Sequence, residues 1–506
     1  MTDDTLSAAR VPPAPTGKRN HPHQEDAARV TAETSPNDVA HTNSDGSGAR
    51  TARAHLLVAS LLFVVGILAA TFASLQLVLP NVATGIAVVT YGRIAPASRI
   101  LITYGWAIPG LLGLGYYALT HITGKDVRSR VLTTASLALI GLGAASGAVG
   151  VLLGLSSGIS GQEAPVWARA LIAIGVLLAA VSTSSTARMS GDRLGTAGWY
   201  LTSAPLLLAA SMIVGLIPAP PGIPGAIMSS FVGSGVTLFL LTGSIGLLYF
   251  VFGRISGSDL AAPRHLAALG FWSLLLVWAF MNGTELIYSA APDWLETITV
   301  AMAIASFVPA IAIATDIGLM LRGRVAGIGD RASLRYAVVA ALSLSAATGV
   351  NFLLTWRASS AIVQYSIWVQ GLSVLIVLGG ASFAIFAGHR VLNGGREKGG
   401  SFHFASSTIA LLLAAGALLV GGVLSGFSWA GGPASQKFSN YGGGWEVTTS
   451  TLAPVLWAVH LALMLYAAAQ IVFLARIASR NDETLPIPDH GDSYDLQFAG
   501  EPRYIT

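Results

Sequence analysis

Ten histidines carry most of the metal-binding chemistry that this sequence offers, because imidazole binds iron, copper and zinc. Nine of them lie in the polar ends of the chain or where an apolar segment ends. Only His460 lies well inside an apolar segment, with Met464 one helical turn later. His460 is therefore either a ligand to a metal or a heme, or a packed residue bonded to a neighbouring helix. The ten are His21, His23, His41, His55, His121, His265, His389, His403, His460 and His490.

Three of the charged side chains that lie inside apolar segments or at their ends are candidates for function, because an unpaired charge there is costly. Glu285 is either a proton-carrying or cation-coordinating carboxylate, or a group that reaches the membrane surface or bonds a backbone amide. Asp316 lies six residues before Arg322, where an interfacial position is the simpler interpretation. Arg99 either meets Glu285 across a shared cavity or anchors its segment at the surface.

Residue types and missing motifs exclude several other chemistries. The sequence has no cysteine, which removes disulfides, thiolate metal sites, iron–sulfur clusters and cysteine nucleophiles. It also has no GxxxxGK[ST] phosphate loop, no HExxH zinc helix, and no GxSxG nucleophile with catalytic-triad partners at plausible positions. Glycine pairs such as Gly141 and Gly143 are typical of close helix packing.

The elements that position these side chains are membrane helices. Of the 506 residues, 53% are hydrophobic and 10% are charged, whereas soluble domains carry about 25% charged residues. The mean hydropathy is +0.66. A soluble protein cannot hide that much apolar surface, so the composition predicts an all-α, polytopic membrane protein.

Twelve apolar segments are long enough to cross a bilayer core of about 30 Å at 1.5 Å per residue. Their length predicts twelve transmembrane helices, joined by short loops rich in glycine and proline. The segments are residues 55–80, 97–121, 131–156, 166–187, 198–217, 226–252, 265–288, 297–321, 334–355, 363–388, 403–428 and 452–477.

Polar tails flank the transmembrane domain of residues 55–477. Residues 1–54 read as a disordered tail, and residues 478–506 read as a second polar tail. The loops after the even-numbered segments hold fourteen Lys and Arg residues, against five on the other side. This asymmetry predicts a multi-pass plasma-membrane protein with both tails cytoplasmic. The net charge of +4 reflects these loops, and no nucleic-acid partner is expected.

Two segments resemble subunit I of the heme-copper oxidases, in particular the C-type cytochrome c oxidases and nitric oxide reductases. Residues 91–96 (YGRIAP) and 104–106 (YGW) resemble the start of the family's second helix. Residues 270–297, including the PDW turn at 292–294, resemble its seventh and eighth helices. The resemblance covers about residues 55–477. It implies a cytochrome c oxidase subunit I-like bundle of twelve helices and a place in the respiratory chain.

The resemblance also assigns six histidine positions, which this sequence fills with other residues. Ser98, Leu372 and Val374 stand at the positions that would bind heme. Gly233, Thr284 and Glu285 stand at or near those that would bind the active-site metal. No heme and no metal are therefore expected, although a heme would be present if this interpretation is wrong. Arg99, Glu285 and Gln370 are candidates to line a polar cavity in the vacated space.

Three hypotheses follow for the function. The first is a subunit I-like protein of a bacterial plasma membrane that lacks redox centres, is not an enzyme, and has an accessory or assembly role in a respiratory complex. The second is a transporter or channel for a small solute or protons through the vacated cavity. The third is an active oxidase with displaced ligands, one of them His460. The expected partners are lipid and other respiratory subunits.

Overall fold

The computed structural model describes residues 36–159, 161–190, 194–220, 222–256, 264–280, 283–322, 331–393, 401–430 and 443–478. By its internal contacts the chain divides into Met1–Asn43 and Ser44–Thr506. All the helices that could span a membrane lie in the second unit. Most of the predicted N-terminal tail and the C-terminal tail from residue 479 lie outside the described residues.

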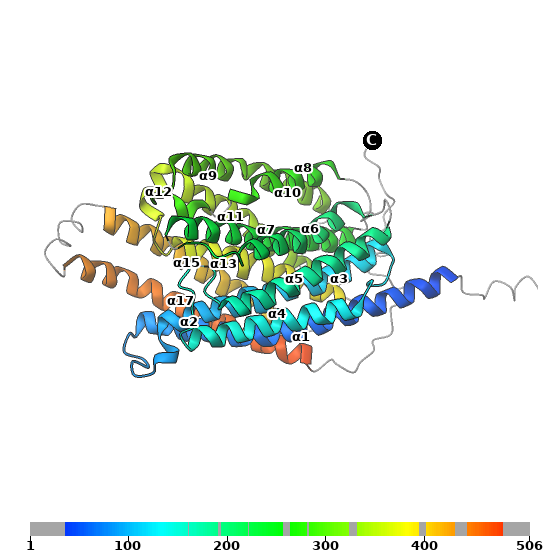
Figure 1. The fold of residues 1–506 in the computed structure, drawn as a ribbon, viewed down its shortest axis with the longest axis horizontal. Helices are drawn as coiled ribbons and strands as arrows, with labels where there is room; N and C mark the ends of the chain where they lie inside the picture. Colours follow the sequence, from blue (N-terminus) through cyan, green and yellow to red (C-terminus); the bar gives the residue numbers. More distant parts are fainter. Residues whose placement is uncertain are drawn as a thin grey trace, which may run out of the picture. The chain divides into compact units, whose positions relative to one another are not determined.

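The second unit is a bundle of helices, and the described residues contain no strand. Figure 1 shows the helices running along a common direction. The main helices are α1 (Pro36–Val78), α2 (Tyr91–Ile100), α3 (Ile108–Thr123), α4 (Arg130–Leu152), α5 (Val166–Ala187), α6 (Gly195–Val214), α7 (Ile223–Ser256), α8 (His265–Val277), α9 (Asp293–Ala305), α10 (Phe307–Leu321), α11 (Ala332–Thr355), α12 (Arg357–Val363), α13 (Trp368–Val374), α14 (Ser382–Leu392), α15 (Ser401–Ala430) and α17 (Gly443–Ala478).

Two spans are continuous through a π-helical segment, in which the backbone bonds one residue further along than in an α-helix. Leu101–Ala107 joins α2 to α3, and Leu375–Ala381 joins α13 to α14. Counted this way, 11 helical segments of the described chain are long and apolar enough to cross a membrane. The shorter apolar helix His265–Phe280 adds a twelfth. Each of the twelve falls on a segment predicted from hydropathy.

Two predicted boundaries are wrong. The seventh segment was expected to continue to residue 288, but its helix ends at Phe280. The PDW turn lies beyond that end, and the chain forms a short 3₁₀ turn, Gly283–Leu286, before α9. The first helix begins earlier than residue 55, so part of the segment 1–54 is helical and not a disordered tail. Ala52 is fully buried there, and Ser47 donates a hydrogen bond to Asp126.

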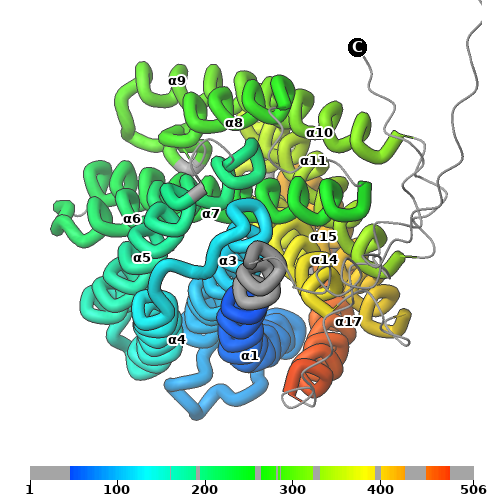
Figure 2. The backbone as a smooth tube through the Cα atoms, turned by 90° about the vertical axis from the view of Figure 1, so that its right-hand side faces the viewer, coloured from blue at the N-terminus to red at the C-terminus, as the bar shows by residue number. Residues whose placement is uncertain are grey.

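The core of the bundle forms around α3 and α7. In the spans Tyr91–Thr123 and Ile223–Ser256, 83% of the most apolar stretch is buried, compared with 28% in Asp293–Leu321. Figure 2, which looks along the helices, shows α3 and α7 inside the bundle and α9 and α10 near its edge.

Small residues allow neighbouring helices to approach closely, as on α4 and α5. A Cβ atom at Gly143 would lie 3.0 Å from the carbonyl oxygen of Ala168 on α5. A Cβ atom at Gly175 would lie 3.0 Å from the carbonyl oxygen of Ser136 on α4. Lipid supplies little hydrophobic drive between helices, so this backbone proximity is a main source of their association. The high glycine content is explained in this way.

Candidate functional site

The second span carries Ser98 at one of the positions that the resemblance assigns to a heme ligand. Ser98 lies in α2 and is 4% exposed. Its hydroxyl donates a hydrogen bond of 2.7 Å to the carbonyl oxygen of Ala95 in the same helix. This position therefore carries a short hydroxyl that is bonded within its own turn, and no imidazole nitrogen reaches the bundle from it.

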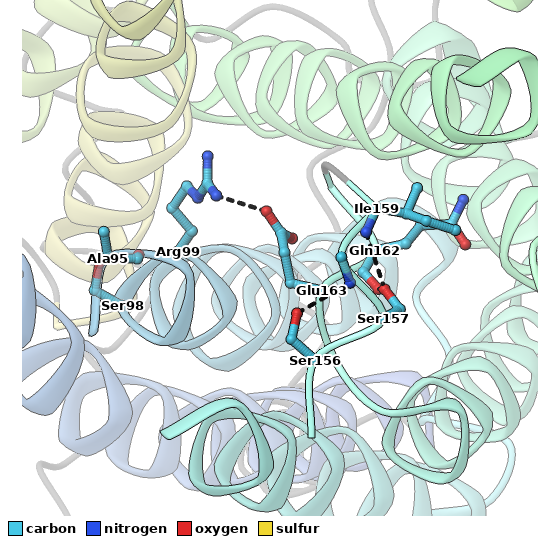
Figure 3. Close-up of polar contacts among 9 residues, drawn as sticks. Ala95, Ser98, Arg99, Ser156, Ser157, Ile159, Gln162 and Glu163 are labelled. Atoms are coloured by element: carbon cyan, nitrogen blue, oxygen red, sulfur yellow. Dashed lines mark hydrogen bonds and ion pairs between the residues drawn. The ribbon is translucent and has the colours of Figure 1, made fainter. Parts of the chain in front are cut away.

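Arg99, the next residue, forms an ion pair with Glu163 in the loop between α4 and α5. Its Nη2 atom lies 2.5 Å from Oε1 of Glu163 (Figure 3). The Arg99 side chain is 62% exposed and that of Glu163 is 11% exposed. A pair with Glu285 was the alternative raised from sequence. The Glu285 side chain lies outside the described residues, and the loop after α4 brings another carboxylate, that of Glu163, over the start of the second span.

The loop that holds Glu163 is folded back on itself by local hydrogen bonds. The Ser157 hydroxyl donates to the carbonyl oxygen of Gln162 at 2.6 Å, and Ser157 also bonds Glu163 through the backbone. Arg169 on α5 donates to the Gln162 side chain and, at 3.0 Å, to the carbonyl oxygen of Gly215 beyond α6. The signal in the sequence was the polar pair Gln162 and Glu163 within a small-residue loop.

The positions assigned to active-site metal ligands lie partly outside a membrane helix. Thr284 and Glu285 are in the 3₁₀ turn Gly283–Leu286 that follows the end of the seventh span. Thr284 is 5% exposed, whereas the Glu285 side chain lies outside the described part of the chain. Gly233, the third such position, lies on α7 and is half-buried. No imidazole stands at these positions.

A second loop binds this 3₁₀ turn. The Gln364 side chain donates to the carbonyl oxygen of Thr284 at 2.6 Å, and the Tyr365 hydroxyl donates to that of Ile287 at 2.7 Å. Tyr365 has φ 63°, a left-handed conformation that is unfavourable for a bulky side chain. The backbone N–H of Tyr288 in turn donates to Glu296 at 2.6 Å. The loop between α12 and α13 thus fixes the segment in which Thr284 and Glu285 lie.

The tenth span holds the remaining assigned positions. Leu372 and Val374 are half-buried aliphatic residues of α13, and neither can bind iron. Gln370 is exposed, and its amide nitrogen donates to the carbonyl oxygen of Ile367 at 3.1 Å, within the first turn of that span. Arg99 pairs with Glu163, and no hydrogen bond or ion pair among the described residues joins Arg99 to Gln370.

Aromatic rings fill the space between the second, tenth and twelfth spans. Trp106, which is fully buried, stacks on Phe63 of α1 with ring centroids 4.4 Å apart and an interplanar angle of 3°. Its indole Nε1 donates to the Ser382 hydroxyl at 2.9 Å. Phe386 and Phe473 pack against the same indole, at 5.8 and 6.2 Å.

That aromatic cluster is anchored at the two π-helical segments. Trp106 lies in the first of them, and Ser382 directly follows the second. The Ser382 hydroxyl donates onward to the carbonyl oxygen of Val377 at 2.8 Å. Tyr466 on α17 donates to that of Leu378 at 3.3 Å. Two carbonyl groups of the second π-helical segment therefore accept side-chain hydrogen bonds, one from the same span and one from α17.

His460 is a packed residue in this structure. It is 6% exposed, and its Nδ1 atom lies 2.9 Å from the Ser74 hydroxyl on α1. Met464, the neighbour that raised the ligand interpretation, is 50% exposed. A histidine that ties two helices together through one hydrogen bond needs no metal to account for its burial.

The other histidines of the bundle are dispersed. The Tyr336 hydroxyl and His403 Nδ1 lie 2.7 Å apart, and His389 lies 2.9 Å from the Asn393 amide. His55 and His121 each bond the backbone one turn before them, through Thr51 and Tyr117. Among the described residues, no three His, Cys, Asp or Glu side chains come together as a metal site.

Asp316 makes a buried ion pair, but with a residue other than the nearby Arg322. Arg264, just before α8, donates through Nε and Nη2 to the two carboxylate oxygens at 2.8 and 2.9 Å. The Asp316 side chain is 6% exposed. These two hydrogen bonds raise the pKa of the Arg264 guanidinium. The pair joins the seventh and eighth spans at the arginine-rich end of the bundle.

A cavity of about 260 Å³ lies between α7, α8, α10, α11 and α13. Its lining is mainly aliphatic, with Thr237, Ser306 and Asn351 toward one end. Leu372 lines the wall, whereas Arg99 and Gln370 do not. The cavity next to Leu372, one of the assigned ligand positions, is therefore mainly apolar.

Comparison with known proteins identifies the class to which this fold and these positions belong. The family model for cytochrome c and quinol oxidase polypeptide I matches residues 50–461. A solved heme-copper terminal oxidase dimer shares the fold with a TM-score of 0.67, at 14% identity over 85% of this chain and 84% of that one. The chain belongs to the cytochrome c and quinol oxidase subunit I family, as the sequence motifs predicted.

Curated relatives are distant but match most of the chain. A cytochrome c oxidase subunit 1 homolog of Agrobacterium tumefaciens is 22% identical over 396 residues, which is 72% of each chain. The cytochrome c oxidase subunit 1 of Rhodobacter capsulatus is 22% identical over 416 residues, 74% of this chain and 75% of its own length. The cbb3-type subunit CcoN1 of Stutzerimonas stutzeri is 22% identical, over 72% of this chain and 81% of its own.

Proposed function

We propose that this chain is a subunit I-type membrane scaffold that works without heme or copper, in an accessory or assembly role for a respiratory complex. The observation that carries the proposal is the set of side chains at the assigned ligand positions. Aliphatic and hydroxyl groups at Ser98, Leu372 and Val374 provide no axial nitrogen for a heme. Function lies in such sites and is not implied by the fold alone.

The packing around Trp106 supports the same proposal. Buried rings from four spans meet there, and they occupy the space around Trp106 at close-packed distances. The histidines also support it, because His460, His403 and His389 each bond a side chain from elsewhere in the bundle or helix.

The two alternatives have less support. A transporter or channel for polar solutes needs a hydrated path, and the cavity beside Leu372 is lined mainly by aliphatic groups. An oxidase with displaced ligands would use His460, whose ring is bonded to Ser74.

The accessory role is tested by isolating the affinity-tagged full chain from its native membranes in a mild detergent. We expect subunits of a respiratory complex to co-purify in fixed proportion and to be identified by mass spectrometry. The same preparation from a strain that carries an unrelated tagged twelve-span protein is the control. If the chain is recovered without respiratory subunits, both after extraction in mild detergent and after cross-linking of the membranes, this role is excluded.

A further inference from the structure

The apolar cavity opens sideways between α10 and α11. Ala314 and Gly318 on α10 and Leu342 and Ser345 on α11 line it, and all four are exposed residues of the bundle. Figure 2 shows α10 and α11 side by side near the edge. The cavity is therefore a groove that is open at the outer surface of the bundle.

Small residues make this groove. Ala310, Ala314 and Gly318 recur every four residues, so they lie on one face of α10. A Cβ atom added at Gly318 would meet nothing within 4 Å. Where Gly143 and Gly175 bring two helices into contact, Gly318 leaves its side of the helix open.

The dimensions and lining suit a hydrocarbon chain. The groove follows α10 from Ser306 to Leu321, about 22 Å of helix at 1.5 Å per residue. This exceeds the ~15 Å that one leaflet contributes to the hydrocarbon core. The apolar lining of the groove offers water too few hydrogen bonds. The exposed rim of the groove faces the acyl chains of the bilayer.

One end of the groove lies next to positive charge. Phe252 and Leu321 line that end, and Arg254 and Arg322 follow them in the chain. Within the described residues, Arg264 pairs with Asp316, and neither Arg254 nor Arg322 has an ion pair. Basic pockets between helices at a membrane surface favour anionic lipid headgroups.

We propose that the groove between α10 and α11 binds one acyl chain of an anionic phospholipid, with the lipid phosphate against Arg322 and Arg254. The chain would lie along Gly318 and Ala314 and reach toward Ser306. This inference goes beyond the proposed function and does not depend on it, because lipid binding is measured without reference to heme or to respiratory partners.

The test is native mass spectrometry of the purified full chain, titrated with phosphatidylglycerol or with phosphatidylcholine of the same acyl chains. We expect phosphatidylglycerol to bind about tenfold more tightly than phosphatidylcholine. Gly318→Leu fills the groove and should weaken phosphatidylglycerol binding by about tenfold or more. Arg322→Gln combined with Arg254→Gln should bring the affinity for phosphatidylglycerol down to that for phosphatidylcholine.

Matched variants separate the groove from general effects on the bundle. Gly416→Leu on α15 also adds a side chain where a Cβ meets nothing within 4 Å, and Arg188→Gln removes an exposed arginine at the same end. Both should bind phosphatidylglycerol like the unmodified protein. Unchanged binding by Gly318→Leu, or equal binding of the two lipids to the unmodified protein, would overturn the proposal.

Discussion

At the scale of single residues, two ion pairs among the described residues differ in burial and therefore in what each contributes to stability. The Asp316 carboxylate is nearly enclosed and accepts two hydrogen bonds from Arg264, whereas Arg99 of the other pair is mostly exposed. Loss of one partner of the Arg264–Asp316 pair leaves an uncompensated buried charge, whereas loss of one partner of the Arg99–Glu163 pair leaves a hydrated charge.

We therefore predict that Asp316→Asn destabilises the protein by about 3 kcal/mol, and that Arg99→Gln costs less than about 1 kcal/mol. Thermal unfolding in detergent, followed by tryptophan fluorescence, measures both. The double variant Arg264→Met with Asp316→Leu is the control, and it should recover much of the loss because no charge remains buried. Equal effects of Asp316→Asn and Arg99→Gln would contradict this ranking.

Sequence reasoning at this scale succeeded where a side chain has one dominant constraint. His460 could be expected to be a packed residue because a lone histidine in a helix bundle finds a hydroxyl on a neighbour, here Ser74. It did not identify the partners of Arg99 and Asp316, because the sequence does not show which loop folds over which helix end. Glu163 and Arg264 are the partners that only the tertiary structure reveals.

At the scale of elements, the π-helical segments connect the second and tenth spans through Trp106 and Ser382. We predict that Trp106→Ala lowers the free energy of unfolding by about 3–5 kcal/mol, since it removes a fully buried ring and its hydrogen bond. Trp272→Ala is the control, because Trp272 is 62% exposed. Chemical unfolding followed by circular dichroism compares the two, and a larger loss for Trp272→Ala would refute the assigned role of Trp106.

The loop between α12 and α13 makes a second prediction at this scale. Gln364→Ala removes the hydrogen bond to Thr284, so amide hydrogens of residues 283–288 should exchange about tenfold faster with deuterated water. Gln370→Ala, which alters an exposed amide bonded within its own turn, should leave these amides unchanged. Hydrogen–deuterium exchange with mass spectrometry measures these exchange rates in both variants. Unaltered exchange in Gln364→Ala would show that Gln364 does not hold this turn.

Elements were predicted better than their ends. Hydropathy located all twelve spans, because a bilayer demands long apolar helices. The hydropathy pattern placed the end of the seventh span eight residues too late, at residue 288. Leu286 and Ile287 are apolar, but they pack in a loop that other loops hold in place. The two π-helical segments had no sequence signal, because they depend on side chains from other spans.

At the scale of the whole molecule, the distribution of arginine and lysine predicts that both tails are cytoplasmic. Reporter fusions at residue 30 and at residue 490, scored for cytoplasmic fluorescence and periplasmic phosphatase activity, measure this directly. We expect fluorescence without phosphatase activity at both positions. A fusion after residue 220, between α6 and α7, should give the reverse result and serves as the control.

We propose that a subunit I fold persists in this protein without the redox chemistry of its family. The most direct measurement is the heme content of the purified full chain from a heme-replete host, by reduced-minus-oxidised absorbance and a pyridine hemochrome assay. We predict less than about one heme per ten chains in a helical, monodisperse sample. One or two hemes per chain would contradict it and would require ligands other than the residues at Ser98, Leu372 and Val374.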